Sequence, residues 1–387
     1  MEKTRKRGVV YEPIAFSELP GWDDDDHLAG LKAFIASCPR VLDLRKATAG
    51  RGRKSQTPKE LVEVCHAALA LPSKITRKQA RAFLEEMFRP QRVVHDKLEG
   101  LLTSYYEPLL HGSRTRHGKF QTPILKRPKD LVTAVPETSG KTAHRGVTHG
   151  RRTASGISPL PTRAEIAAGA LAHQNLELLY LQSPVDLYFL QIQGSGKIQL
   201  RDGSIARVSY DGKNGHAYTS IGRYLIDKGL VAAHKMSMGA LGRWLKADPA
   251  RGQMVMNLNA SYVFFKETPA EDSGPPGAMG TPLIAGRSLA VDPGVHALGS
   301  PIYVSTPTLV LTGTTKPFRR LMVAQDVGAA IKGPERGDIF MGSGDKAQHR
   351  ASRVRHPGNL FVFLPRSGVR REAAVPGQSV APVSRRR

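Results

Sequence analysis

The pattern of apolar and polar residues changes twice along the chain and divides it into three parts. From residue 12 to residue 95, apolar residues recur at the three- and four-residue spacing of amphipathic helices. Beyond Leu101, short apolar or alternating runs are separated by turn residues, which is typical of strands. After Pro365 the chain is rich in Arg, Pro and Ser, so we expect a disordered tail.

Helix starts are marked in several places by a threonine with an acid or amide three residues later. This capping pattern occurs at Thr57–Glu60, Thr76–Gln79 and Thr162–Glu165. Each pattern precedes an apolar periodic segment, so each predicts the first turn of a helix. Further helices are predicted over 27–38, 218–228, 237–246 and 346–354.

Two blocks of short strands are predicted. The first block has strands at 102–106, 120–125, 176–182, 185–193, 197–200, 205–210 and 262–265. The second has strands at 288–291, 301–304, 321–324, 338–341 and 360–364. Residues 126–160, rich in Lys, Arg, Gly, Thr and Pro, are predicted to form an exposed loop. Strands at this spacing favour a small barrel or sandwich in each block.

Length and composition fit a globular protein of two domains, because 387 residues exceed one ordinary core. The formal net charge of +24 has two interpretations: an arginine-rich composition of loops and tails, or attraction to an anionic partner such as nucleic acid, a membrane surface or a cell-wall polymer. Only 6% of the residues are aromatic, which argues against a single-strand nucleic-acid binder. Cys38 and Cys65 lie in separate helical segments, and buried thiols are the favoured interpretation.

The chain contains no run of 18 apolar residues, so no transmembrane helix is predicted. The basic N-terminus lacks the apolar segment of a signal peptide, and none is predicted there. The 13 histidines are scattered, without His-Glu-x-x-His or Cys-x-x-Cys spacing, so neither a metal nor another cofactor is expected.

Carboxylates next to glycines are the candidate chemistry. Asp345 and Asp202 are interpreted as turn formers whose side chains bond their own backbone, and the same interpretation is strong for Asp292. Asp326 stands at the end of the apolar run from Leu321, before a glycine. Asp338 lies in a predicted strand beside Ile339, where an unpaired charge is costly. From position alone, Asp338 is equally well explained as catalytic or structural.

Several stretches together resemble one family. The segment 321–345, with Asp292, Asp326 and Asp338, resembles the 3D domain of the lytic murein transglycosylase A family, which is named for three aspartates. Further stretches similar to the same family are Leu-Thr-Ser-Tyr-Tyr-Glu-Pro at 102–108, Tyr-Phe-Leu-Gln-Ile-Gln-Gly-Ser-Gly at 188–196, and the segment 256–265. The chain departs from the family pattern at Ser104, Val327 and Ala329, where the family usually has Gly, Thr and Gly.

The resemblance implies a mainly β fold with N-terminal helices. A double-psi β-barrel would be built from residues 1–105 and 265–367, and a smaller β-barrel, residues 106–264, would be inserted into it. The substrate would lie in a groove between the two domains. Residues 368–387 would form a basic disordered tail.

The activity implied is cleavage of the β-1,4 bond between N-acetylmuramic acid and N-acetylglucosamine, with a 1,6-anhydro product. Asp338 aligns with the single catalytic aspartate of the family, which acts first as acid and then as base. Asp326 would orient Asp338 or stabilise the transition state, and Asp292 would support them. Thr103, Tyr105, Gln193 and Ser195 match family motifs and are the expected sugar-binding residues.

The resemblance also implies a periplasmic or outer-membrane location and a monomer that acts on peptidoglycan strands, with other cell-wall enzymes as open candidates for partners. Specific nucleic-acid binding is not expected. Two alternatives remain: a non-catalytic glycan-binding protein with the same groove, and a basic nucleic-acid binder. Exo or endo action is left open.

Overall fold

The computed structural model describes residues 4–6, 9–49, 58–95, 99–133, 149–154, 156–271, 273–352 and 354–366. The chain forms two compact units. Unit 1 comprises residues 1–102, 277–339 and 356–387, and unit 2 comprises residues 103–276 and 340–355. The predicted tail after 366 and the predicted cap at Thr57 lie outside the described residues.

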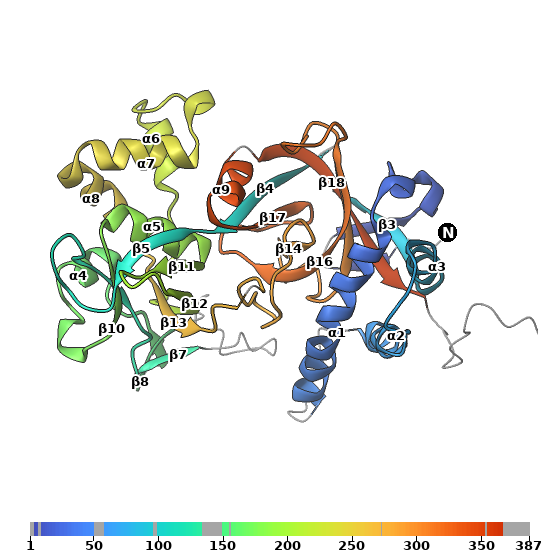
Figure 1. The fold of residues 1–387 in the computed structure, drawn as a ribbon, viewed down its shortest axis with the longest axis horizontal. Helices are drawn as coiled ribbons and strands as arrows, with labels where there is room; N and C mark the ends of the chain where they lie inside the picture. The colour runs from blue at the N-terminus through green and yellow to red at the C-terminus, as the bar shows by residue number, and fades with distance from the viewer. Residues whose placement is uncertain are drawn as a thin grey trace, which may run out of the picture. The chain divides into compact units, whose positions relative to one another are not determined.

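Six strands of one sheet close into a barrel (Figure 1). The strands are β4 (Gly100–Glu107), β14 (Ser288–Val291), β15 (Pro301–Thr306), β16 (Phe318–Val327), β17 (Arg336–Ser343) and β18 (Arg355–Pro365). Their order is β18-β15-β16-β14-β17-β4, and a β18–β4 pairing closes the ring. The edge beyond β18 is extended by β3 (Phe88–Val94), β2 (Val9–Pro13) and β1 (Thr4–Lys6).

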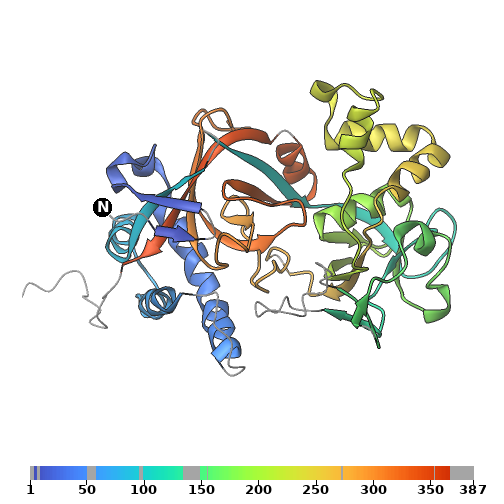
Figure 2. The same ribbon diagram turned by 180° about the vertical axis from the view of Figure 1, so that it is seen from behind.

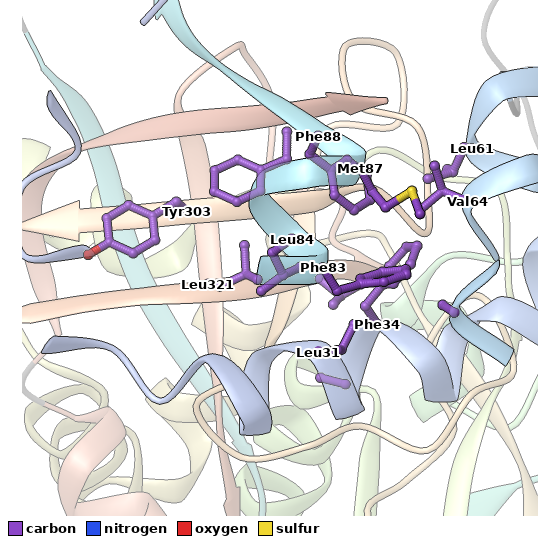
Figure 3. Packing of buried hydrophobic residues seen from close by; sticks show 14 of the residues in the cluster. Leu31, Phe34, Leu61, Val64, Phe83, Leu84, Met87, Phe88, Tyr303 and Leu321 are labelled. Atoms are coloured by element: carbon purple, nitrogen blue, oxygen red, sulfur yellow. The ribbon is translucent and has the colours of Figure 1, made fainter. Parts of the chain in front are cut away.

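Three helices cover one side of this sheet (Figures 1 and 2). They are α1 (His27–Ala49), α2 (Lys59–Leu69) and α3 (Arg77–Met87), preceded by short 3-10 turns at Phe16–Glu18 and Trp22–Asp24. Figure 3 shows the apolar core, in which Phe34 of α1 and Phe83 of α3 pack with Leu321 and Tyr303 of the sheet. Because Leu321 and Tyr303 alternate with residues of the opposite face, the strands present one apolar face to the helices.

The cap predicted at Thr76 is confirmed. Its hydroxyl accepts a hydrogen bond from the Gln79 amide at 3.2 Å, and the Gln79 side chain accepts one from the Thr76 amide at 2.8 Å. These two bonds satisfy backbone donors that the first turn of α3 leaves without helical partners.

Replacing Thr76 with Ala is expected to lower the free energy of unfolding by about 1 kcal/mol, because one capping acceptor is lost. Urea unfolding measures the change. Lys78→Ala, an exposed substitution in the same turn, is the control and should stay within about 0.5 kcal/mol. Equal effects of the two substitutions would show that the cap contributes nothing.

Unit 2 is organised around a second, smaller barrel. Its strands are β5 (Leu109–Ser113), β6 (Thr122–Leu125), β10 (Glu177–Leu181), β11 (Ser195–Gln199), β12 (Ile205–Lys213) and β13 (Val263–Thr268). They follow the order β13-β12-β11-β5-β10-β6, and an isolated bridge between Lys126 and Phe265 joins the two ends. The fold class implied by the resemblance, two β-barrel units with N-terminal helices, is therefore confirmed.

Helices of unit 2 are α4 (Arg163–Ala167), α5 (Pro184–Gln193), α6 (Ile221–Asp227), α7 (Met238–Ala247), α8 (Pro249–Asn257) and α9 (Gly344–Ala351), with 3-10 turns at Ala172–Gln174 and Ala233–Lys235. The strand predicted at 185–193 is wrong, because this segment is α5. The Ser183 side chain accepts a bond from the Val185 amide at 3.1 Å, and Pro184 occupies the first helical position. Ser183 and Pro184, which separate the strands predicted at 176–182 and 185–193, therefore form a helix start and not a turn between strands.

The predicted exposed loop at 126–160 is also partly wrong. It contains a three-stranded sheet of β7 (Leu131–Thr133), β8 (His149–Thr153) and β9 (Gly156–Ser158). Residues 134–148 lie outside the described residues. Leu131 is buried with Leu125 and Phe264 in an apolar cluster, so the apolar residues of this segment have a packing role that its polar composition conceals.

Cys38 and Cys65 are free thiols buried in the core of unit 1. A hydrogen bond with Cys65 and burial raise the pKa of Cys38, because both favour the neutral thiol. No helix in the described ranges is long and apolar enough to cross a membrane.

Candidate active site

Two of the three aspartates singled out in the sequence flank one small residue in unit 1. Ala290 of β14 pairs with Asp326 of β16 on one side and with Asp338 of β17 on the other. Residues that lie opposite each other on paired strands point to the same side of a sheet. Strands lie about 4.8 Å apart, so the two aspartate backbones are about 10 Å apart with only a methyl group between them.

A local irregularity produces this arrangement. The register of β14 and β16 shifts between Leu289 and Ala290, so that Gln325 has no partner on β14. Gln325 is fully buried, and its amide nitrogen donates to the Ser37 hydroxyl at 2.6 Å on α1. Its side-chain oxygen accepts a bond from Ser288. The bulge is thus held by buried hydrogen bonds, and it sets where Asp326 emerges.

The carboxylate of Asp326 is anchored by backbone. Its Oδ1 accepts hydrogen bonds from the amides of Ala278 and Val327, each at 2.9 Å. The side chain is half-buried at the end of β16. These two bonds fix the orientation of the carboxylate relative to the barrel.

Asp338 is half-buried in the middle of β17, between residues that are closely packed. A Cβ at Gly337 would stand 2.9 Å from the Leu102 side chain, so a larger residue there would require Leu102 to shift. Ile339 is fully buried and, by strand alternation, points to the opposite face from Asp338. Phe340 shares the face of Asp338, and its ring lies 5.3 Å from that of Tyr105. A half-buried acid and a buried aromatic side chain that packs against Tyr105 therefore follow each other along one face of β17.

The predicted sugar-binding residues lie within unit 2. Thr103 and Tyr105 are half-buried and share one face of β4, the strand that pairs with β17. Gln193, the last residue of α5, is buried, and its side-chain oxygen accepts a bond from the Tyr106 amide at 3.0 Å. Ser195 is buried on β11, where it pairs with Ser209. Gln193 thus connects α5 to the strand that carries Tyr105.

Ser104, where the sequence departs from the family pattern, has a structural partner. Its side chain is buried and donates to the Ala351 carbonyl at the end of α9 at 3.1 Å. The hydroxyl therefore caps a carbonyl that the end of the helix leaves without a helical donor.

Asp292 organises the turns next to the two aspartates. Its Oδ1 accepts a bond from the Gly294 amide and its Oδ2 one from the Gly333 amide, both at 3.0 Å. The Nζ of Lys332 lies 3.7 Å from Oδ1 of Asp292. Burial works toward a higher pKa of Asp292, but the two amide bonds and Lys332 outweigh it and hold the pKa below its usual value. Asp292 thus ties the turn after β14 to the loop between β16 and β17.

Sequence reasoning missed a buried ion pair in unit 2. Glu107, at the end of β4, is 0% exposed, and its Oε1 lies 2.9 Å from Nε of Arg207 on β12. Ser343, at the end of β17, donates to the Glu107 carboxylate at 2.6 Å. Arg207 also donates to the Ser273 carbonyl at 2.7 Å. Glu107 was visible in the Tyr-Tyr-Glu-Pro run, but its partner is 100 residues away in sequence.

The described residues contain no group of three or more His, Cys, Asp or Glu side chains placed to hold a metal ion. Asp326 and Asp338 supply carboxyl groups, and two backbone amides hold the Asp326 carboxylate.

Comparison with known proteins places this architecture in a defined class. A family model described as the MltA specific insert domain matches residues 101–266, and a model described as the 3D domain matches residues 287–364. The class is that of proteins in which a 3D-domain barrel carries an MltA-type insert. The chain belongs to the lytic murein transglycosylase A family.

Relatives with this architecture include the membrane-bound lytic murein transglycosylase A of Escherichia coli K12. It is 37% identical over 270 residues, which are 69% of this chain and 66% of that protein, so the chain spans about two thirds of its length. A membrane-bound lytic murein transglycosylase of Agrobacterium tumefaciens is 35% identical, with a TM-score of 0.80 over 92% of this chain and 97% of that one. A structure of E. coli MltA with bound chitohexaose is 30% identical, with a TM-score of 0.63 over 94% of each chain.

Proposed function

We propose that this protein is a lytic transglycosylase that cleaves peptidoglycan glycan strands. The observation that carries the proposal is the pair of aspartates on either side of Ala290. The names of the relatives support the activity, and the chitohexaose bound to the E. coli protein supports a glycan ligand. The substrate bond would be the β-1,4 linkage from N-acetylmuramic acid to N-acetylglucosamine.

In the proposed mechanism Asp338 acts twice. Its carboxyl group first gives a proton to the glycosidic oxygen as the bond from that oxygen to C1 of the muramic acid breaks. The C6 hydroxyl of the same sugar then attacks C1 and closes a 1,6-anhydro ring. Its proton passes to the Asp338 carboxylate, which restores the starting state. No water is consumed, because O6 of the same sugar replaces the leaving sugar at C1 in an intramolecular substitution. By convention such an enzyme is classed as a carbon–oxygen lyase.

Asp326 would have a different task. Because two backbone amides hold its Oδ1, it is suited to orienting Asp338 or to stabilising the positive charge that develops at C1. Asp292 would keep the loop between the two strands in place. We assign Thr103, Tyr105, Gln193 and Ser195 to sugar binding, where the half-buried Tyr105 offers a flat face for a pyranose ring.

We further propose that the protein works in the cell envelope, at the periplasmic side of the outer membrane, since its substrate lies there and its curated relatives are described as membrane-bound. Other cell-wall enzymes remain candidate partners.

The test is release of product from purified murein sacculi, analysed by mass spectrometry. We expect muropeptides that end in 1,6-anhydromuramic acid. Reducing ends would indicate a hydrolase instead, and binding without release would indicate a glycan-binding protein.

The small size of residue 290 is expected to matter for the same reaction. Ala290→Leu would place three more carbons between the two aspartates, and we expect turnover of murein to fall about 10-fold or more, because misplacement of a catalytic group by about 1 Å can cost about 100-fold. Ala290→Ser, which adds one atom, is the matched control and should keep most of the activity. Full activity in Ala290→Leu with an unchanged melting temperature would contradict the arrangement.

A further inference from the structure

Unit 2 contains a buried arginine whose environment the proposed reaction does not explain. Arg163 opens α4 and is 6% exposed. Its guanidinium donates to the Asn259 carbonyl at 3.0 Å, the Ser261 carbonyl at 2.6 Å and the Gln191 side-chain oxygen at 2.5 Å. All three acceptors are neutral.

The other two buried arginines of the described residues differ in this respect. Arg207 pairs with Glu107 at 2.9 Å, and Arg287 pairs with Asp25 at 2.9 Å. Arg163 has no carboxylate within 4.0 Å among the described residues. Its guanidinium carbon instead lies over two tyrosine rings, 4.7 Å from the ring centre of Tyr188 and 5.4 Å from that of Tyr262. A buried charge without a counter-charge is costly, and neutral acceptors offset only part of that cost.

Arg163 also lines a cavity of about 250 Å³ within unit 2. The cavity lies among β6, α4, α5 and α8. Leu125, Ile166 and Leu187 give it apolar walls, and Thr122 and Gln253 add polar groups. A guanidinium has five N–H groups, and three of them are used in the bonds above. Two therefore remain outside these three bonds, one on each terminal nitrogen.

We propose that this cavity binds a small organic carboxylate, whose two oxygens accept hydrogen bonds from Arg163 and whose apolar part packs against Leu125, Ile166 and Leu187. A carboxylate matches the planar guanidinium and supplies the missing negative charge. A phosphate would bring more charge and more acceptor oxygens than one arginine and apolar walls can satisfy. The site does not depend on cleavage of peptidoglycan.

Titration of the full chain with butyrate and with butyramide tests the charge requirement. The two probes have nearly the same shape, and only butyrate is charged. Isothermal titration calorimetry is expected to give a Kd in the millimolar range for butyrate and at least about 10-fold weaker binding for butyramide. Equal affinities for the two probes would overturn the proposal. So would the absence of butyrate binding at concentrations up to about 50 mM, which is 50 times a Kd of about 1 mM.

Two variants locate the site. Gln253→Glu puts a carboxylate into the cavity without changing Arg163, and we expect it to weaken butyrate binding about 10-fold or more. Arg163→Gln should abolish binding, while Arg223→Gln, at an exposed arginine paired with Asp227, should leave it unchanged. If Arg163→Gln does not fold, Gln253→Glu decides the outcome. Unchanged butyrate affinity in Gln253→Glu would show that butyrate binds elsewhere.

Discussion

Asp338→Asn is expected to reduce the release of anhydromuropeptides by about 1,000-fold or more, while binding of glycan strands is preserved. Acid or base catalysis by one group is typically worth about 100- to 10,000-fold, and in the proposed mechanism a single carboxyl group serves in both steps. Asparagine keeps the size and polarity of the side chain, but its amide protons are not acidic enough to be transferred to a glycosidic oxygen. The measurement combines turnover on murein sacculi with binding of chitohexaose by calorimetry.

Two further variants separate chemistry from structure in this experiment. Asp326→Asn should lower turnover by a smaller factor, because the role we propose for Asp326 is to orient Asp338 or to stabilise charge. Asp202→Asn is the control, since Asp202 is an exposed turn residue whose carboxylate accepts bonds from Ser204 at 2.6 and 3.0 Å. If Asp338→Asn keeps a tenth of the wild-type turnover, another group is the acid. If it loses binding as well, the effect on turnover cannot be assigned to proton transfer.

Glu107→Gln is expected to give the largest loss of stability, about 3 to 5 kcal/mol, because it leaves the Arg207 cation buried without its counter-charge. The loss should fall on the unfolding transition of unit 2, where Glu107, Arg207 and Ser343 all lie. Urea unfolding followed by tryptophan and tyrosine fluorescence measures it.

A matched control is provided by the exposed ion pair of the same unit, Arg114 with Glu267. Glu267→Gln should cost less than about 1 kcal/mol, because solvent screens the pair. The double variant Glu107→Leu with Arg207→Met, which removes both charges, should recover much of the lost stability. Similar losses of unfolding free energy for Glu107→Gln and Glu267→Gln would mean that the buried ion pair stabilises unit 2 no more than the exposed one does.

Local signals in the sequence were sufficient where the chain makes its own contacts. The Thr76 and Thr162 caps each need only a partner three residues away, and both are present as predicted. The same local reasoning failed at Ser183 and Pro184, because a serine followed by proline is compatible with a turn and with the start of a helix. Burial of Val185, Tyr188 and Leu190 on the helices and strands around them selects the helix.

For the barrel of unit 1, the sequence predicted the strands but not how they pair. Most of its strands could be located from apolar runs, but their order, with β14 parallel to β16 and antiparallel to β17, follows from long-range packing. The position of Asp338 beside an aromatic residue was visible in the sequence. That Asp326 stands across Ala290 from it was not, because the pairing depends on a shift in register at residue 290.

By itself, the amino-acid sequence predicted the capped helices and most strands, because these depend on neighbours within a few residues. It also singled out the three aspartates, because they lie in motifs that resemble those of the family. Only the tertiary structure decided that Glu107 meets Arg207, that Arg163 has no carboxylate partner, and that Ala290 separates Asp326 from Asp338. The physical reason is that burial, pairing of charges and strand register are set by groups far apart along the chain, whose contacts exist only after the chain has folded.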